Sequence, residues 1–204
     1  MCYDDNARPP IPPGANGQAH GEDLVLTAAD NNQFAAYLAQ PTQSQAGGAQ
    51  IVISPDIRGL HQFYKELALR FAEIGISALA FDYFGRTAGL TERNDDFEFW
   101  PHVQQLTYPG LRADIQASLA HLETGRPTFI MGFCMGGSIS ILSSTQNLGL
   151  TGAIGFYAGL SRQMSGTNGT VLEESVHVQN PFLGLFGGAD QGIPPEQVHT
   201  LDEN

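Results

Sequence analysis

The residue best suited to chemistry in this sequence is Cys134, which stands at the centre of the segment Gly-Phe-Cys-Met-Gly at positions 132–136. An apolar run at 128–131 predicts a strand before it, and a helix is expected at about 135–146 after it. A nucleophile on such a sharp strand-to-helix turn needs small residues two positions before and two after it, because strand and helix approach closely there. Gly132 and Gly136 meet this requirement.

The predicted turn also suggests a reactive thiol. It places Cys134 at the N-terminal end of a helix, where unpaired N–H groups stabilise a thiolate relative to a thiol. We therefore predict a thiol pKa below that of free cysteine and a nucleophilic role. The alternative is a buried cysteine that fills core space among glycines.

The elements that must position this turn are predicted from the spacing of apolar residues. A hairpin is expected around Asp30-Asn31-Asn32, since Asp and Asn tolerate turn conformations. Apolar runs typical of strands follow at 51–53, 76–81, 128–131, 152–157 and 182–186. Helical patterns are found at about 61–75, 111–125, 135–146 and from about 194. Strands that alternate with helices require crossover connections, so the sequence predicts an α/β fold with a doubly wound, mostly parallel sheet that starts antiparallel.

Length and composition limit the classes of function. The chain has 204 residues and a formal net charge of −12. Residues 1–22 are proline-rich and predict an extended arm, and residues 23–204 predict one domain. Lys65 is the only lysine, which argues against binding to nucleic acid. No apolar run reaches the roughly 18 residues of a membrane span, no signal peptide is evident, and the two cysteines form no disulfide framework. These features predict a cytoplasmic protein without membrane contact.

Cofactor sites are not evident in the sequence. No His or Cys pair has the spacing of metal ligands. The glycine-rich segments 132–137 and 184–188 lack the Gly-x-Gly-x-x-Gly or Gly-Lys-Ser/Thr frame that binds phosphates. We expect neither a metal nor a bound cofactor.

Three separated segments, in the same order, resemble motifs of the dienelactone hydrolase family of the α/β-hydrolase superfamily. They are Pro-Asp-Ile-Arg-Gly at 55–59, Phe-Asp-Tyr-Phe-Gly-Arg at 81–86 and Gly-Phe-Cys-Met-Gly-Gly at 132–137. The similarity runs from about Leu24 to the carboxyl terminus. It implies an α/β-hydrolase fold over 23–204 with a cysteine nucleophile, and a hydrolase that opens a lactone or cleaves a small carboxylic ester through an acyl-enzyme.

The resemblance also implies roles for residues around the nucleophile. The backbone N–H groups of Ile57 and Met135 are expected to stabilise the oxyanion. Asp56 matches an acidic residue, usually glutamate, that neighbours the resting cysteine and helps to deprotonate it; a loop acid without catalytic role is the alternative. Arg86 matches an arginine that faces the substrate, where it would bind a carboxylate.

The acid and the histidine of the triad lie later in the chain. The resemblance places the acid at Asp190, although this residue could instead cap the helix predicted near 194. Fewer residues follow Asp190 than the roughly 15 that a crossover helix and a strand need. His199, inside the predicted helix, and His61 are weak substitutes for the base. We therefore expect the last strand, its helix and the catalytic histidine beyond Asn204, and an exposed apolar edge near Phe186.

Several interpretations stay open from sequence alone. A non-catalytic α/β-hydrolase-like binding protein would keep the turn and lack the histidine. A redox-sensing thiol would need a resolving cysteine, and Cys2 lies on the arm. Residues 83–109 are aromatic-rich and predict either a wall of the active site or a packed excursion that covers the sheet edge. The expected partner is a small ester or lactone; the oligomeric state is not predicted.

Overall fold

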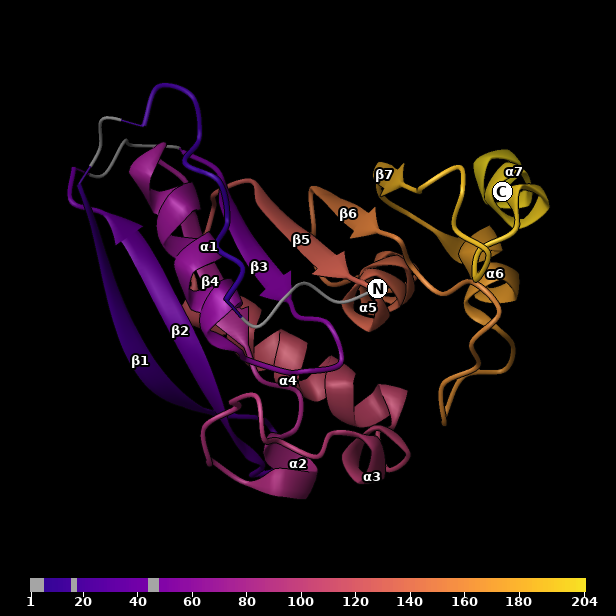
Figure 1. Ribbon diagram of the computed structural model, residues 1–204, viewed down its shortest axis with the longest axis horizontal. Helices are drawn as coiled ribbons and strands as arrows, with labels where there is room; N and C mark the ends of the chain where they lie inside the picture. Colours follow the sequence, from indigo (N-terminus) through magenta and orange to yellow (C-terminus); the bar gives the residue numbers. More distant parts are fainter. Residues whose placement is uncertain (1–5, 16–17, 44–47) are drawn as a thin grey trace.

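A single mixed sheet organises the protein. The computed structural model describes residues 6–15, 18–43 and 48–204. Its sheet has seven strands in the order β1-β2-β4-β3-β5-β6-β7 (Figure 1). The strands are β1 (Ala19–Thr27), β2 (Gln33–Pro41), β3 (Gln50–Ser54), β4 (Ser77–Phe81), β5 (Thr128–Phe133), β6 (Gly152–Phe156) and β7 (Phe182–Leu185). The pairs β1–β2 and β2–β4 are antiparallel and the other pairs are parallel, which confirms the predicted α/β fold.

The antiparallel start is the predicted hairpin. Asn31 takes a positive φ of 67°, a conformation that asparagine tolerates better than most residues. The Ala28 N–H donates to the Asn32 carbonyl at 2.8 Å and closes the turn. β1 begins at Ala19, so the predicted boundary between residues 22 and 23 falls within this strand; the division into arm and domain stays a prediction.

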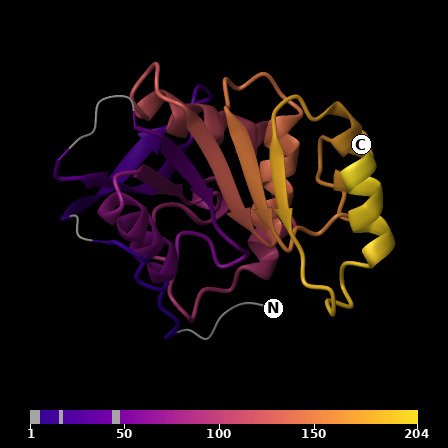
Figure 2. The same cartoon turned by 90° about the horizontal axis from the view of Figure 1, so that it is seen from above.

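Helices cover both faces of the sheet (Figure 2). The longer ones are α1 (Gln62–Glu73), α4 (Tyr108–His121), α5 (Met135–Ser144) and α7 (Pro195–Glu203). Side chains alternate between the faces along each strand, so Ile51 and Ile53 of β3 pack with α1, while Val52 packs in the core that contains α4 and α5. Crossover helices on both faces explain why the central strands are buried on both sides.

Helix α1 shows how local sequence sets an element's ends. The His61 side chain caps its first turn by accepting from the Phe63 N–H. Gly75 follows its last residues with a φ of 92°, which a residue with a Cβ adopts only at a cost. Between these ends, the buried side chains lie on the side that faces the sheet, including Tyr64 and Ala68.

The aromatic interval 83–109 is packed into the core at one end and lines a hollow at the other, and its role as a wall of the active site stays a prediction. It contains the short helices α2 (Gly85–Ala88) and α3 (Trp100–Val103). Tyr83 and Phe84 are fully buried and pack edge to face, as a packed excursion requires. Trp100 is 56% exposed and lines a hollow beside the helix that follows Cys134. The interval therefore supplies core packing at one end and a wall of this hollow at the other.

The far edge of the sheet is apolar. β7 is the last strand in the sheet order, and Leu183 and Leu185 on it are 56% and 41% exposed. The predicted exposed edge near Phe186 is thus present. The short helices α6 (Val171–Glu174) and η1 (Ser175–His177) lie close to α7 beyond this edge (Figure 1).

The described part of the chain contains no helix that is both long and apolar enough to cross a membrane.

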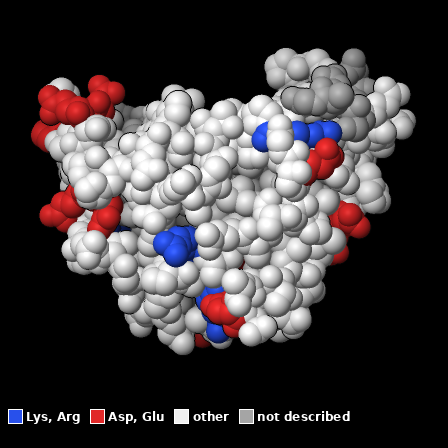
Figure 3. All heavy atoms as spheres, turned by 180° about the vertical axis from the view of Figure 1, so that it is seen from behind, with Lys and Arg blue, Asp and Glu red and all other residues white. Residues whose placement is uncertain are grey.

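On the face shown in Figure 3, acidic side chains gather toward the margins and much of the middle is uncharged. The negative net charge therefore forms no continuous acidic surface on that face.

Candidate active site

Cys134 lies on the tight turn between β5 and α5. A Cβ added at Gly132 would collide with the carbonyl oxygen of Gly136, and one added at Gly136 would collide with the carbonyl oxygen of Ser54. Backbone is therefore in direct contact on both sides of the cysteine, and only glycine fits either position. The spacing requirement predicted from the sequence is confirmed.

The turn holds Cys134 in an uncommon backbone conformation. Its φ of 54° and ψ of −113° are strained for a residue with a side chain, at a cost of about 1–3 kcal/mol. The surrounding structure fixes this conformation: the Cys134 N–H donates to the Phe156 carbonyl (3.0 Å), and the Cys134 carbonyl accepts from the Ser138 N–H (3.2 Å). A strained, fixed residue at a strand end is typical of a functional position.

The predicted direction of the thiol pKa is wrong. Burial raises the pKa of Cys134 above the ordinary value, because desolvation penalises the thiolate. A hydrogen bond from the Met135 N–H lowers it, the nearby Asp56 carboxylate raises it, and the Arg162 guanidinium lowers it. The helix N-terminus thus acts as expected, but half-burial outweighs it.

This electrostatic balance gives a test by alkylation, made in a Cys2→Ser background so that one thiol reacts. The pH profile of iodoacetamide alkylation of Cys134 is expected to have its midpoint above the value of about 8.5 for free cysteine. Asp56→Asn should move the midpoint down and Arg162→Gln should move it up, because these side chains have opposite effects on the pKa of the thiol. A midpoint below that of free cysteine in the parent would contradict this assignment.

The role of the Ile57 and Met135 amides in stabilising an oxyanion stays a prediction, and the structure shows what surrounds each of them. The Met135 N–H is directed at the Cys134 sulfur. In the described part of the chain, the Ile57 N–H enters no backbone hydrogen bond of the turns and loops. The Asp56 carbonyl, which belongs to the same peptide unit as the Ile57 N–H, accepts a hydrogen bond from the Tyr83 hydroxyl. Since carbonyl and N–H of a trans peptide point in opposite directions, Tyr83 fixes the direction of this amide.

Asp56 is fully buried, and its carboxylate already has a partner. Arg58 donates to it through Nε (3.2 Å to Oδ1) and Nη2 (3.1 Å to Oδ2), and the Arg58 N–H adds a bond of 3.0 Å. These bonds fix the position of the carboxylate. The role of Asp56 in assisting the nucleophile stays a prediction, and the electrostatic effect of Asp56 on the Cys134 thiol shows that the two groups are close.

Arg86 is held by two carboxylates. Its Nε and Nη2 donate to Asp114 at 3.0 and 2.8 Å, and Nη1 pairs with Asp30. Asp114 is buried, and desolvation raises its pKa while Arg86 opposes that rise. The guanidinium therefore joins the β1–β2 turn to α4. Its predicted role in binding substrate is untested, and an anion there would compete with these two carboxylates.

Asp190 is exposed at a loop tip after β7. Its Oδ1 accepts from the Gly192 N–H at 2.8 Å, and it borders a hollow with Tyr157, which directly follows β6. Helix α7 has Pro194 at its N-cap and no side-chain cap, so the alternative role for Asp190 as a helix cap is not supported. Its role as the triad acid stays a prediction.

The two weak substitutes for the base are engaged elsewhere. His61 accepts from the Phe63 N–H through Nδ1 (3.4 Å), so Nε2 carries the proton toward Asp95 Oδ1 (2.8 Å). His199 is exposed, and its Nε2 lies 3.3 Å from Oε1 of Glu203. Within the ranges that the structure describes, neither ring is hydrogen-bonded to Asp190.

Sequence reasoning missed Arg162, which follows β6. Its Nη1 lies 3.7 Å from the sulfur of Met135, the residue after the nucleophile. Its backbone is held where the Val171 N–H donates to the Arg162 carbonyl at 2.8 Å. The available signal was its place in a loop at the carboxyl end of a parallel strand, where ligands bind in open α/β sheets.

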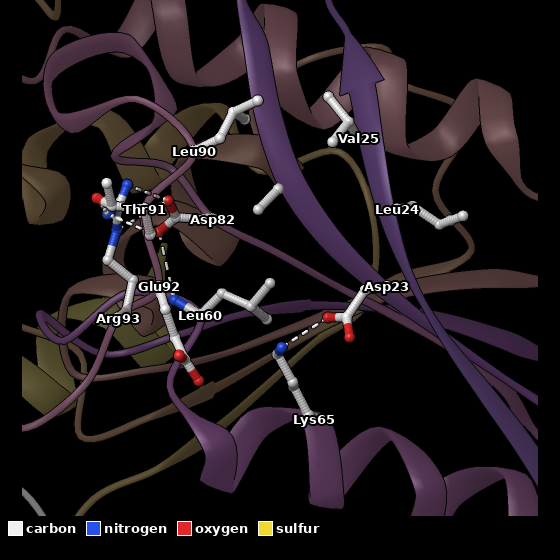
Figure 4. A pocket seen from close by; sticks show the side chains of 11 residues that line it. Asp23, Leu24, Val25, Leu60, Lys65, Asp82, Leu90, Thr91, Glu92 and Arg93 are labelled. Carbon is white, nitrogen blue, oxygen red and sulfur yellow. Dashed lines mark hydrogen bonds and ion pairs between the residues drawn. The ribbon is translucent and has the colours of Figure 1, made fainter.

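Another hollow, of about 420 Å³, lies between β1, α1 and the loop after α2 (Figure 4). Four of its charged groups form ion pairs: Lys65 with Asp23 at 2.6 Å, and Arg93 with Asp82 at 2.8 Å. Burial raises the pKa of Asp82, which Arg93 opposes. These pairs connect elements that are distant in the sequence. We therefore assign the residues around this hollow a role in stabilising the fold.

Comparison with known proteins finds a matching family model and several curated relatives. Residues 34–204 match a family model described as the dienelactone hydrolase family. A carboxymethylenebutenolidase of Rhodococcus opacus is 27% identical over 210 residues, which cover 100% of this chain and 77% of the relative. A protein of Methylorubrum extorquens is 28% identical over 206 residues, covering 97% of this chain and 69% of the relative.

Solved structures share the fold. A cold-adapted esterase from an Arctic intertidal metagenomic library superposes with a TM-score of 0.70 and 17% identity, covering 100% of this chain and 84% of the esterase. The chain spans from 64% to 77% of the length of the curated relatives compared with it.

Proposed function

Because the chain belongs to the dienelactone hydrolase family, we propose that it opens a lactone or cleaves a small carboxylic ester through an acyl-enzyme on Cys134. The observation that carries the proposal is the strand-to-helix turn, where a Cβ on either flanking glycine would collide with backbone. This geometry presents one side chain at the end of a buried strand. The carboxymethylenebutenolidase among the relatives points to the same class of substrate.

In the proposed reaction, Cys134 is the nucleophile and two backbone amides stabilise the oxyanion. The Cys134 sulfur bonds to the carbonyl carbon, and the Ile57 and Met135 N–H groups stabilise the charge on the carbonyl oxygen. The C–O bond to the leaving oxygen then breaks, and that oxygen takes the proton that the thiol released. Water next attacks the thioester, which regenerates the thiol and yields the acid. Asp190 would orient a histidine that serves as the base in both proton transfers.

Trapping the acyl-enzyme tests this proposal. With 4-nitrophenyl acetate in a Cys2→Ser background, a burst of about one equivalent of nitrophenol is expected. Digestion and mass spectrometry should find one acetyl group on the peptide that contains Cys134. The raised thiol pKa implies a burst that is faster at alkaline pH. The absence of both a burst and acetylation at Cys134, at every pH from neutral to alkaline, would refute the proposal.

A binding protein without turnover is the second candidate, favoured by one observation. Within the described residues, the Asp190 carboxylate accepts from the Gly192 N–H and is bonded to no histidine. Such a protein would bind a small ester, and the acetyl group on Cys134 would persist. Steady release of nitrophenol after the burst, lost in Asp190→Asn, would decide for the hydrolase.

Tyr83 should act as a positioning residue for the oxyanion. Tyr83→Phe removes the hydroxyl that fixes the Asp56 carbonyl, so the Ile57 N–H loses its fixed direction. Removing an oxyanion donor costs about 10²–10³ in kcat, and loosening one is expected to cost roughly tenfold. KM should change by less than about twofold, because the amide acts mainly in the transition state. An equal change in KM and kcat would indicate a general structural role.

A further inference from the structure

Arg162 is a cation without a carboxylate partner beside the nucleophile. In the described ranges, six of the other arginines form ion pairs with carboxylates: Arg8, Arg58, Arg70, Arg86, Arg93 and Arg126. Arg162 has no such pair there, and the one hydrogen bond given for its guanidinium in those ranges goes to the sulfur of Met135, which is a weak acceptor. A half-buried charge without a carboxylate partner is costly in free energy. An anionic ligand bound to Arg162 would reduce this cost.

The hollow next to Arg162 has room for one. Its volume is about 410 Å³, within the range of sites for small molecules. Its apolar lining residues include Val103, Leu106, Met135 and Met164, and polar side chains line the rest. Met135, one of these lining residues, directly follows the nucleophile Cys134 in the chain. The charge of Arg162 also reaches the nucleophile, since it lowers the pKa of the Cys134 thiol.

We propose that Arg162 binds the carboxylate of an anionic ester or lactone whose carbonyl lies at Cys134, with the apolar lining residues packed against the carbon skeleton of the substrate. This inference rests on the proposed hydrolase function and adds the residue that determines its specificity. It assigns to Arg162 the contact that the sequence assigned to Arg86, whose guanidinium is engaged by Asp30 and Asp114.

The negative net charge of the protein means that an anionic substrate needs a cation close to its binding site. The protein carries a formal net charge of −12, so an anionic substrate is repelled at long range. A guanidinium in a partly apolar hollow acts at short range, where water screens it less. Its fork of N–H donors matches the two oxygens of a carboxylate.

A matched pair of esters tests the assignment. The acetate ester of 4-hydroxybenzoate is anionic, and the acetate ester of 4-hydroxybenzamide has the same shape without the charge. Arg162→Gln is expected to raise KM for the anionic ester roughly tenfold or more, the range of a charge-assisted hydrogen bond. KM for the neutral ester should stay within about twofold, and Arg162→Lys should restore part of the loss. Equal effects on both esters, or none, would overturn the assignment.

Arg112→Gln is the matched control. Arg112 is also outside the carboxylate pairs in the described ranges, and its Nη1 lies 3.3 Å from Gln146 Oε1 on a different part of the surface. This variant should leave KM for both esters unchanged. A rise for the anionic ester in Arg112→Gln would show that overall charge, rather than a local contact, sets the preference.

Alkylation separates this inference from the hydrolase proposal because it needs no turnover. In a Cys2→Ser background, the rate of Cys134 alkylation by anionic iodoacetate is divided by the rate with neutral iodoacetamide. A change in thiol pKa cancels in this ratio. The ratio should fall severalfold in Arg162→Gln. A fall in the ratio without any ester turnover would keep the anion site and refute the hydrolase, and turnover with an unchanged ratio and unchanged KM values would refute the site alone.

Discussion

Cys134→Ala in the full-length protein is expected to abolish hydrolysis of an activated aryl ester, with a loss in kcat of roughly 10⁴-fold or more. The physical reason is that no acyl-enzyme forms without the sulfur, and the oxyanion donors alone supply only a small part of the acceleration. Alanine meets the same backbone strain at φ 54°, so the fold should survive the change. Release of 4-nitrophenol measures the rate, and circular dichroism verifies the fold.

Cys134→Ser is the control for this variant. The hydroxyl takes the place of the thiol on the same turn, but it is harder to ionise, and burial already disfavours the charged form at this position. A small residual activity is therefore expected, above that of the alanine variant. Turnover in Cys134→Ala equal to that of the parent would remove Cys134 from the mechanism.

Arg93→Ala is expected to lower the free energy of unfolding by about 3–5 kcal/mol, the usual loss when one partner of a buried ion pair is removed. The side chains of Arg93 and Asp82 are each only 1% exposed, and Nη2 lies 2.8 Å from Asp82 Oδ2. Arg93 also donates to the carbonyls of Thr91 (2.6 Å) and Gly89 (2.7 Å). Urea unfolding at neutral pH measures the loss.

The pH dependence of this variant has a defined sign. Burial raises the pKa of Asp82 in the folded protein, and loss of the guanidinium raises it further. A folded-state pKa above the unfolded one gives stability that is lost as pH rises through the folded value. The deficit of Arg93→Ala should therefore be smaller in mild acid than at neutral pH.

Arg70→Ala provides the matched control. Arg70 pairs with Glu73 at 2.7 Å on helix α1, and both side chains are partly exposed. Surface pairs of this kind contribute up to about 1 kcal/mol. A loss for Arg93→Ala no larger than that for Arg70→Ala would mean that the buried pair does not stabilise the fold.

Sequence by itself determined the features that depend on local geometry. The turn at Cys134 could be predicted because close approach of strand and helix excludes any Cβ at positions 132 and 136, and this constraint spans five residues. The hairpin at Asn31 and the end of α1 at Gly75 depend likewise on which residues accept a positive φ. The alternation of strands and helices follows from apolar periodicity, so the fold class was predicted correctly as well.

Only the tertiary structure decided which charges meet. Arg86 contacts Asp30 and Asp114, which are 56 and 28 positions away, and no local pattern encodes such pairs. Arg162 reaches Met135 across 27 positions for the same reason. The sign of the Cys134 pKa shift was also decided there. The helix end that lowers the pKa is visible in the sequence, while the burial that raises it is a sum over neighbours that only the folded chain brings together.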